Sequence, residues 1–482
     1  MNWKNYFLYR VSTFIKILKQ WANHPGILVC FGFISGIIFS SLSFFIFICV
    51  TALIIRTHKI LVLIFTIFYI IGSLYTLKIQ DIINYANVTI SNPQELNLVV
   101  LEPPTPNLYT QEIIVQIDGT YGYAIGEIPL NVKLEAGSKI KIKGSFTYQD
   151  SEEKYIKYLN SKRVFYKLEV DQILAVKNTG LIYNLQTIRR SLINTLGRSL
   201  GGESGGLLNG ILLGTEGSLS NRSLENLKQT GTTHIISASG FNVMVIFILI
   251  RSTLFFCKRT YRNIVAIAFS IVYVLMIGWF ILPALRALFM LAILTIGKEF
   301  GRKVSNTFLI LSSISLILLQ YPFYYKNISF QLSLFATSSL FIFSPSIQSW
   351  LDRNKLPEIL SENISATFAV LIGTIPISFL AFGQISIISP LANLLTAPLV
   401  PILMYLGLLL IIFQLTELEL LAKLAIFIAK IITSIFFKII YTLSNLEIST
   451  TKSKSIALLF LISIILCFIL FDKNNIEKRY KG

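Results

Sequence analysis

Long apolar runs separated by short basic loops dominate the chain from residue 235 to residue 471. A run of about 20 apolar residues is long enough to cross the hydrocarbon core of a bilayer as a helix. The runs lie near 235–256, 263–281, 283–297, 304–320, 328–346, 364–382, 388–413, 420–445 and 455–471. Only 14% of the 482 residues are charged, whereas 54% are hydrophobic. This pattern predicts an α-helical, polytopic membrane protein and excludes an ordinary soluble globular protein.

The first 80 residues predict a surface helix followed by three more membrane spans. Residues 1–24 mix basic and apolar residues at helical spacing, which is typical of an amphipathic helix lying in the membrane interface. Residues 25–80 contain a long apolar run, which we divide into two short spans near Ser40, and a third span at 60–77. Together with the runs above, we expect about 12 transmembrane segments.

The basic residues predict how the chain is oriented in the cell membrane. The net charge is +18, from 42 Lys and Arg against 24 Asp and Glu. Because cytoplasmic loops are enriched in Lys and Arg, the tail 472–482 is expected inside and residues 81–232 outside. The basic pair at 452 and 454 does not fit this scheme. The positive excess also suits a polyanionic partner, and both explanations remain open.

Residues 81–180 predict a β domain inserted between the membrane segments. Apolar and polar residues alternate at 112–118 and 139–143, and glycines separate these stretches. We expect a small barrel or sandwich of about five or six strands, with a helical patch at 152–160. Residues 181–232, with three arginines on a helical pattern, are expected to form an amphipathic linker at the membrane surface.

A polar stretch at residues 230–240 precedes the first apolar run of the core. Hydroxyl, imidazole and glycine residues at the start of a membrane helix need hydrogen-bond partners or water. Ser239 or Asn242 is expected to cap the following helix. His234, Ser239 and Gly240 resemble the His…Ser-Gly signature of ComEC-type competence membrane proteins. That family often has a histidine where this chain has Asn242.

Three more polar residues stand in motifs that resemble the same family. Arg286 lies in an Arg-Ala…Met motif, Gln331 in Phe-Gln-Leu-Ser, and Asn393 in Pro-Leu-Ala-Asn…Pro. An arginine in hydrocarbon costs roughly 2.5–3.5 kcal/mol, so Arg286 should face a partner, water or the membrane interface. Gln331 serves either a polar path or a helix–helix hydrogen bond. Prolines beside Asn393 predict a broken helix next to a polar cavity.

The resemblance implies a channel for single-stranded DNA in natural transformation. It implies as partners the DNA, membrane lipid, a DNA receptor on the outer face, a cytoplasmic helicase-like motor and a separate nuclease. We expect the substrate path to involve His234, Ser237, Ser239, Gly240, Asn242, Arg286, Gln331 and Asn393. The family carries an OB-like domain at 81–180, where DNA-binding residues would be Tyr121, Tyr123, Lys139, Lys141, Lys143, Tyr148 and Tyr166.

The residues give little support to an enzyme. Three histidines and four cysteines are scattered without metal-ligand spacing, so no metal site and no cofactor are expected. The chain resembles the form of the family that lacks a C-terminal metallo-β-lactamase-like domain. A serine hydrolase is disfavoured because His234 lies only five residues before Ser239 on one segment. The alternative is a transporter, or a transferase for lipid-linked substrates, that does not handle DNA.

Overall fold

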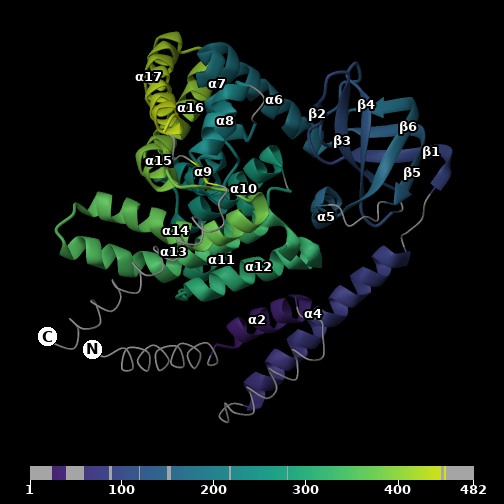
Figure 1. Cartoon of the computed structure of the whole chain (residues 1–482), viewed down its shortest axis with the longest axis horizontal. Helices are drawn as coiled ribbons and strands as arrows, with labels where there is room; N and C mark the ends of the chain where they lie inside the picture. Colours follow the sequence, from purple (N-terminus) through teal and green to yellow (C-terminus); the bar gives the residue numbers. More distant parts are fainter. Residues whose placement is uncertain are drawn as a thin grey trace. The chain divides into compact units, whose positions relative to one another are not determined.

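The computed structural model describes residues 24–38, 59–85, 90–118, 120–148, 154–215, 219–278, 280–446 and 450–451 (Figure 1). The interfacial helix expected at 1–24, apart from residue 24, lies outside these residues, as do the second half of the run 25–55, the span at 455–471 and the tail 472–482. Within them, the chain divides into two compact units, which are described one at a time. The first unit comprises Leu192–Phe255 and the described residues from Ile328 on, and the second comprises the described residues of Ala22–Ser191 with Phe256–Asn327.

Two helices near the start of the second unit pack closely against each other. They are α2 (Pro25–Ile38) and α4 (Lys59–Tyr85). A Cβ atom on Gly36 would lie 2.1 Å from the carbonyl oxygen of Tyr69, so only glycine lets the two backbones approach this far. The span predicted at 60–77 is confirmed as a helix, but that helix continues to Tyr85. The predicted start of the β domain at residue 81 is therefore wrong, because the polar residues after Leu77 extend the helix instead of ending it.

Six strands form one mixed sheet in the second unit. They are β1 (Ile90–Val100), β2 (Thr105–Pro106), β3 (Thr110–Ile117), β4 (Tyr123–Pro129), β5 (Lys139–Tyr148) and β6 (Val164–Lys177). The strand order is β1-β5-β6-β4-β3-β2, and β1 also pairs with β3. The five long strands therefore close on themselves as a barrel. Only the β4–β6 pairing is parallel, while the other four closing pairs are antiparallel.

The alternation seen in the sequence decides which side chains fill this barrel. In β5, Ile140 and Ile142 are buried while Lys139, Lys141 and Lys143 are exposed. Successive side chains of a strand point to opposite faces, so one face of β5 joins the core and the other meets solvent. The short helix α5 (Lys154–Ser161), predicted at 152–160, lies between β5 and β6.

The rest of the second unit is helical. Its elements are the first part of α6 (Leu181–Leu200), then α10 (Arg259–Ile277), α11 (Leu282–Glu299), α12 (Asn306–Gln320) and η2 (Pro322–Lys326). At the end of α11, the Glu299 carboxylate accepts hydrogen bonds from Thr260 at 2.7 Å and Asn263 at 2.6 Å. These bonds fix α10 beside α11 and use a carboxylate that would otherwise be a costly charge next to apolar helices.

The first unit is built from helices. Its elements are α7 (Gly202–Leu213), α8 (Asn221–Gln229), η1 (Thr233–Ile235), α9 (Gly240–Thr253), α13 (Ile328–Arg353), α14 (Glu358–Phe382), α15 (Ser389–Thr396), α16 (Leu399–Leu415) and α17 (Glu419–Ser444). A two-stranded sheet, β7 (Ile385–Ser386) with β8 (Thr450–Thr451), joins them. Gly407 of α16 packs directly on Leu208 and Leu212 of α7, which brings these two helices close together.

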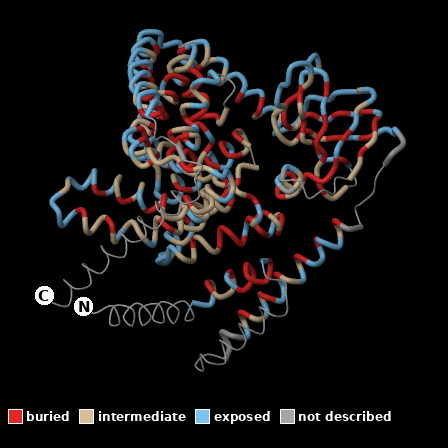
Figure 2. Tube along the Cα trace, viewed as in Figure 1, coloured by how far each residue is buried: buried red, intermediate tan, exposed pale blue. Residues whose placement is uncertain are grey.

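The helices are those of a multi-pass membrane protein. Among the described residues, 6 helices are long and apolar enough to cross a membrane, or 7 if α15 and α16, bent by 41°, count as one span. Figure 2 shows many exposed residues on helices that are otherwise apolar, such as α17. Apolar side chains exposed along such helices are expected where lipid covers them.

Candidate functional site

The polar stretch at 230–240 folds back on the helix that precedes it. Thr230 and Thr232 are both 0% exposed, and their hydroxyl oxygens lie 2.8 Å apart. The Thr230 hydroxyl donates to the carbonyl oxygen of Asn226 at 2.8 Å, and that of Thr232 donates to Leu227 at 3.4 Å. These hydroxyls therefore add second hydrogen bonds to carbonyl groups in the last turn of α8, which also accept from the backbone N–H groups of Thr230 and Thr232.

His234, in η1, and Ser237, between η1 and α9, are exposed, whereas Ser239 and Asn242 make internal contacts. Ser239 is the residue before α9 but does not cap it with its side chain, so this prediction is wrong. Its hydroxyl donates instead to the Asn242 side-chain oxygen at 3.0 Å. The Asn242 amide is 2% exposed and donates to the carbonyl oxygen of Ile211 at 2.7 Å. Asn242 thus fastens α9 to α7 and contributes no exposed amide.

Two glycines near the end of α7 let the turn pack directly on that helix. A Cβ atom on Gly210 would lie 3.0 Å from Ile236, and one on Gly214 would lie 2.8 Å from Ala238. Gly214 also has φ of 65°, a conformation that favours glycine, and ends α7. The turn that carries Ser237 is therefore packed closely against the end of α7.

A second motif, about 150 residues away in sequence, contacts this turn. The Ser386 hydroxyl donates to the carbonyl oxygen of Gln229 at 2.7 Å. Gly231, with φ of 69°, approaches Ser389 so closely that a Cβ atom there would lie 2.9 Å from it. Asn393 donates to the Ser389 hydroxyl at 3.1 Å, one turn along α15. Residues 229–242 and 385–397 together are called the polar junction below.

Two predicted path residues, Gln331 and Arg286, do not belong to the polar junction. Gln331 is half-buried in the first turn of α13, in the same unit. Arg286 belongs to the second unit, where it lies on α11 and is 8% exposed. Burial of this arginine, with Pro283 in the first turn of its helix, argues against a side chain that extends freely to the membrane interface.

The three predicted DNA-binding lysines lie on one exposed face of the barrel. Lys141 pairs with Glu95 of β1 at 2.6 Å, and the hydrogen bond from Lys141 lowers the pKa of that carboxyl. Lys143 lies directly opposite Glu95 in the register, whereas Lys139 lies opposite Lys177 of β6. Positive charge is therefore least compensated at the Lys139 end of the face.

The predicted aromatic residues contact other parts of the same unit. Tyr166 is 1% exposed, so its ring is a core side chain and offers no face to a base; its predicted stacking role is not compatible with this position. Tyr148 lies edge-on to it at 6.0 Å between ring centroids. Tyr121 and Tyr123 hold the guanidinium of Arg163 at 4.1 and 5.1 Å from their ring centroids. The alternation of side chains along the strands does not predict that the guanidinium of Arg163 packs against the rings of Tyr121 and Tyr123.

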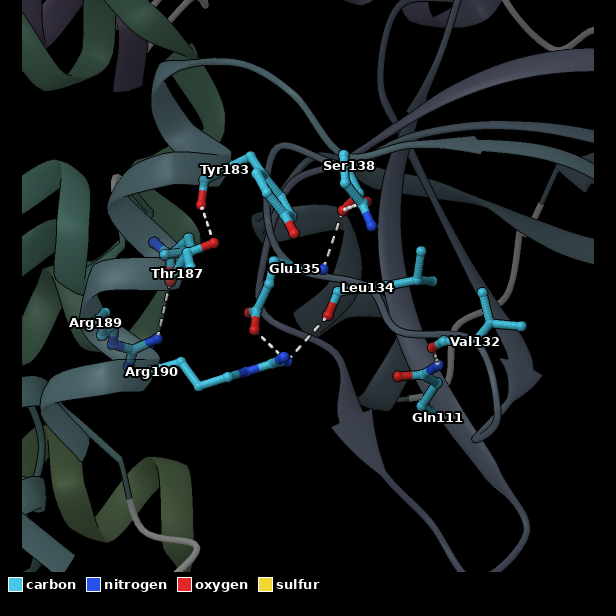
Figure 3. A network of polar contacts seen from close by, with 11 residues as sticks. Gln111, Val132, Leu134, Glu135, Ser138, Tyr183, Thr187, Arg189 and Arg190 are labelled. Atoms are coloured by element: carbon cyan, nitrogen blue, oxygen red, sulfur yellow. Dashed lines mark hydrogen bonds and ion pairs between the residues drawn. The ribbon is translucent and has the colours of Figure 1, made fainter. Parts of the chain in front are cut away.

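A network of polar contacts ties the barrel to α6 (Figure 3). Glu135, in the loop between β4 and β5, is 7% exposed and forms an ion pair with Arg190. Burial raises the pKa of the Glu135 carboxyl, and the charge of Arg190 opposes this shift. Arg190 also donates to the carbonyl oxygen of Leu134 at 3.4 Å. On the same helix, Gln186 donates to Met276 at 2.9 Å, so α6 joins the barrel loop to the end of α10.

Sequence reasoning missed three lysines on α17, at residues 423, 430 and 438. Each lysine is visible in the sequence, but the high average hydropathy of residues 420–445 favours an ordinary membrane span and hides them. For metals, the part of the chain that the structure describes contains no group of three or more His, Cys, Asp or Glu side chains that could hold an ion.

Comparisons with known proteins agree with the pattern of motifs. ComE operon protein 3 of Bacillus subtilis (strain 168) is 25% identical over 272 residues, which are 55% of this chain and 33% of that protein. The chain thus spans about a third of the length of the curated relative it matches. No solved structure matches the chain. The competence protein family matches residues 211–474, which include the whole polar junction. Because this match covers more than half of the 482 residues, the chain belongs to the competence protein family, of the ComEC type.

Proposed function

We propose that this protein conducts single-stranded DNA across the cytoplasmic membrane during natural transformation. The observation that carries the proposal is the polar junction, where two interrupted helices meet. The span that ends in α9 begins with a polar turn, and α15 is bent by 41° from α16. Interrupted helices at membrane depth are tolerated where protein or water satisfies the freed backbone groups. Such a meeting point suits a path for a hydrophilic substrate.

The residues of the junction have two kinds of role in this proposal. The exposed side chains of His234 and Ser237 contact the substrate, while Ser239, Gly240, Asn242 and Asn393 shape the turn. Gln331 and Arg286 are proposed to line further parts of the path. A mostly neutral polar lining with few cations attracts a phosphate backbone without trapping it.

The proposal includes about twelve membrane spans, with residues 81–232 outside the cell membrane and the tail 472–482 in the cytoplasm. Helices α2, α11 and α12 count as spans in this scheme, although α2 and α12 have only 14 and 15 residues. Helices this short cross a bilayer where it thins locally around the protein. Cysteine labelling of position 120 from outside intact cells is the expected result, and labelling only from the cytoplasm contradicts this topology.

The barrel is proposed to be an OB-like domain that binds single-stranded DNA weakly. In chain order its five long strands are β1, β3, β4, β5 and β6, and the fourth returns to pair with the first, which is a Greek-key arrangement. A five-stranded Greek-key barrel is the OB architecture. The exposed lysines of β5 would contact phosphates, so binding should weaken as salt rises.

We propose no covalent chemistry for the protein. A DNA receptor on the outer face would deliver the substrate, a cytoplasmic helicase-like motor would pull it, and a separate nuclease would degrade the second strand. Purified protein is then expected to show no metal-dependent nuclease activity. Cleavage that follows the protein through purification and is lost on mutating it would contradict this expectation.

The proposal is tested by uptake of fluorescently labelled DNA in cells that lack the gene. Uptake should fall to background in the deleted strain and return when the gene is restored. Unchanged uptake in the deleted strain would favour a transporter or lipid-linked transferase. A matched pair, His234→Ala and Lys228→Ala, separates the junction from its surroundings, since both residues are exposed but only His234 lies in the proposed path.

A further inference from the structure

Three lysines interrupt the apolar sequence of α17 and lie on one face of it. They are Lys423, Lys430 and Lys438. At about 100° per residue, seven and fifteen residues bring Lys430 and Lys438 to within roughly 20° and 60° of Lys423 around the helix axis. All three side chains are exposed. α17 is long and apolar enough to span the membrane, and it therefore carries a row of positive charge along one face of a membrane-spanning helix.

The position of Lys430 makes this row costly in lipid. It lies 11 residues after Glu419 and 14 before Ser444, or about 16 and 21 Å from the two ends of the helix. A lysine at the centre of a membrane helix costs roughly 2.5–3.5 kcal/mol and normally meets a partner or water. Lys423, near the start of α17, has such a partner, because Glu419 lies 3.1 Å away one turn earlier.

The other two lysines lack a carboxylate of this kind. Over the described ranges, no Asp or Glu oxygen lies within 4.0 Å of the Lys430 or Lys438 ammonium group. Exposed ammonium groups without an acidic partner on an apolar helix are suited to an anionic ligand that comes from outside the chain.

A groove continues the row at the end of α17. It has a volume of about 390 Å³ and lies between α17, the first turn of α7 and α8, with Ser434 and Tyr441 among its lining residues. Lys438 lies between these two residues in the sequence of α17 and is not itself a lining residue. The guanidinium of Arg222, from α8, is held 5.0 Å from the ring centroid of Tyr441. Arg222 thus adds a fourth cation to the same face.

One acidic residue, Glu203, also lines this groove, and one of its two carboxylate oxygens, Oε2, is buried without a hydrogen-bond partner among the described residues. An oxygen of the Glu203 carboxylate accepts a hydrogen bond from the backbone N–H of Ser220 at 3.1 Å, just before α8 begins. A hydroxyl contact of 2.7 Å between Ser204 and Thr433 holds the first turn of α7 against α17. The groove is therefore a fixed surface that carries the exposed cation of Arg222 and the half-buried carboxylate of Glu203.

We propose that Lys430, Lys438 and Arg222 form a binding track for the phosphates of a single-stranded nucleic acid. This track rests on the proposed function and names the helix along which the substrate moves. Lys430 and Lys438 are about 12 Å apart along the axis, so they bind separate phosphates. Lysine suits a moving backbone because its point charge on a flexible stem imposes no fixed geometry. Binding at several weak sites permits release as well as capture.

Salt-dependent DNA binding by the purified full chain in detergent tests the track. The probe is a fluorescent oligothymidylate, and the quantity is the slope of log K against log salt concentration. Each phosphate contact that is lost lowers the magnitude of this slope by about 0.7 for single strands. K430Q with K438Q should lower it by roughly 1.4. K430R with K438R should keep the slope, because the charges remain.

A matched control uses the lysine that already has a partner. K423Q removes one lysine from the same face but leaves the slope nearly unchanged, because Glu419 neutralises Lys423 in the protein. An equal change in the slope for K423Q and for K430Q would overturn the proposal, because it would show a general effect of helix charge. An unchanged slope in K430Q with K438Q would also overturn it.

Three further outcomes are distinct from one another. If K430Q with K438Q changes thermal stability in anionic but not neutral lipid nanodiscs, with DNA binding unaltered, the lysines contact lipid headgroups and the track is wrong. If cellular DNA uptake requires the gene but is normal in K430Q with K438Q, the track fails and the proposed function stands. If uptake does not require the gene, the proposed function itself fails.

Discussion

The cations of the barrel and those of the apolar helices have similar chemistry, but the free energy needed to place them is small on the barrel and large on the apolar helices. Lys139, Lys141 and Lys143 lie on an exposed strand face, where Glu95 pairs with Lys141 at 2.6 Å. Surface pairs of this kind contribute about 0–1 kcal/mol and place little constraint on the fold. Arg286 and Lys430 instead occupy apolar helices, where a charge is expensive unless it has water or a partner. The more costly position is the stronger indication of function.

The largest expected effect is at Arg286. Because its guanidinium is buried on α11, Arg286→Gln should reduce DNA uptake by about tenfold or more, as loss of a charged hydrogen bond of 1.5–3 kcal/mol does. Arg286→Lys should keep part of the activity, since a point charge still attracts phosphate. Uptake and protein level are measured together for both variants. Reduced abundance in both, with normal uptake per molecule, would assign Arg286 a structural role and weaken the comparison.

The track on α17 should show the next largest effect. K430Q with K438Q should lower uptake by several-fold to about tenfold at normal abundance, if each lost contact is worth about 0.5–1.5 kcal/mol. K423Q serves as the control on the same helix, because its charge is already paired. Uptake measured at two ionic strengths checks the cause. A loss of uptake that does not depend on salt argues against phosphate contact.

The barrel lysines should matter least for uptake. Replacing Lys139, Lys141 and Lys143 by glutamine should lower it by about two- to threefold, because exposed charges contribute only a few tenths of a kcal/mol each. The effect should be concentrated at Lys139, which lies opposite Lys177 and not opposite an acid. A larger loss here than in the α17 variants would reverse the comparison and make the barrel the principal binding surface.

The ion pair of Glu135 with Arg190, between the barrel and α6, should have the smallest effect on DNA uptake, but it should make the stability of the folded protein depend on pH. Burial raises the pKa of Glu135 in the folded protein. The folded state then favours the protonated carboxyl, so this contribution to stability is present below about pH 4 and is lost as pH rises through the raised pKa.

Glu135→Gln removes the titrating group and tests this sign. Amide exchange of residues 130–138 in the full chain should differ between variant and wild type more at pH 7 than at pH 4. The reason is that the wild-type carboxyl resembles the amide once it is protonated. A difference that grows as the pH falls contradicts the assigned direction of the shift.

The sequence predicted most helices and strands because their patterns are local. The alternation at 139–143 and the helical patch at 152–160 are confirmed as β5 and α5. The closed barrel was less accessible, since it depends on the pairing of Leu98 with Ile117 and on the parallel pairing of β4 with β6. Such pairings join distant residues, and no local pattern encodes them.

The candidate site was predicted in its parts but not in its assembly. The motifs around His234 and Asn393 were both recognised, yet only the structure brings Gly231 against Ser389. The sequence left open whether the hydroxyls of the polar stretch meet water or protein, and in the structure those of Thr230 and Thr232 fold back onto α8. Tyr166 could not be separated from an exposed tyrosine without knowing which face of β6 fills the barrel.

The central claim is that DNA moves along cations carried by apolar helices, and site-specific photocrosslinking during uptake tests it most directly. A photoreactive residue at position 434 would lie between Lys430 and Lys438, while one at position 435 would point about 100° away. Both positions are exposed, so they form a matched pair. The account predicts crosslinks to incoming DNA at position 434 and few at position 435. Efficient uptake without crosslinks at 434, or equal crosslinking at both positions, would contradict it.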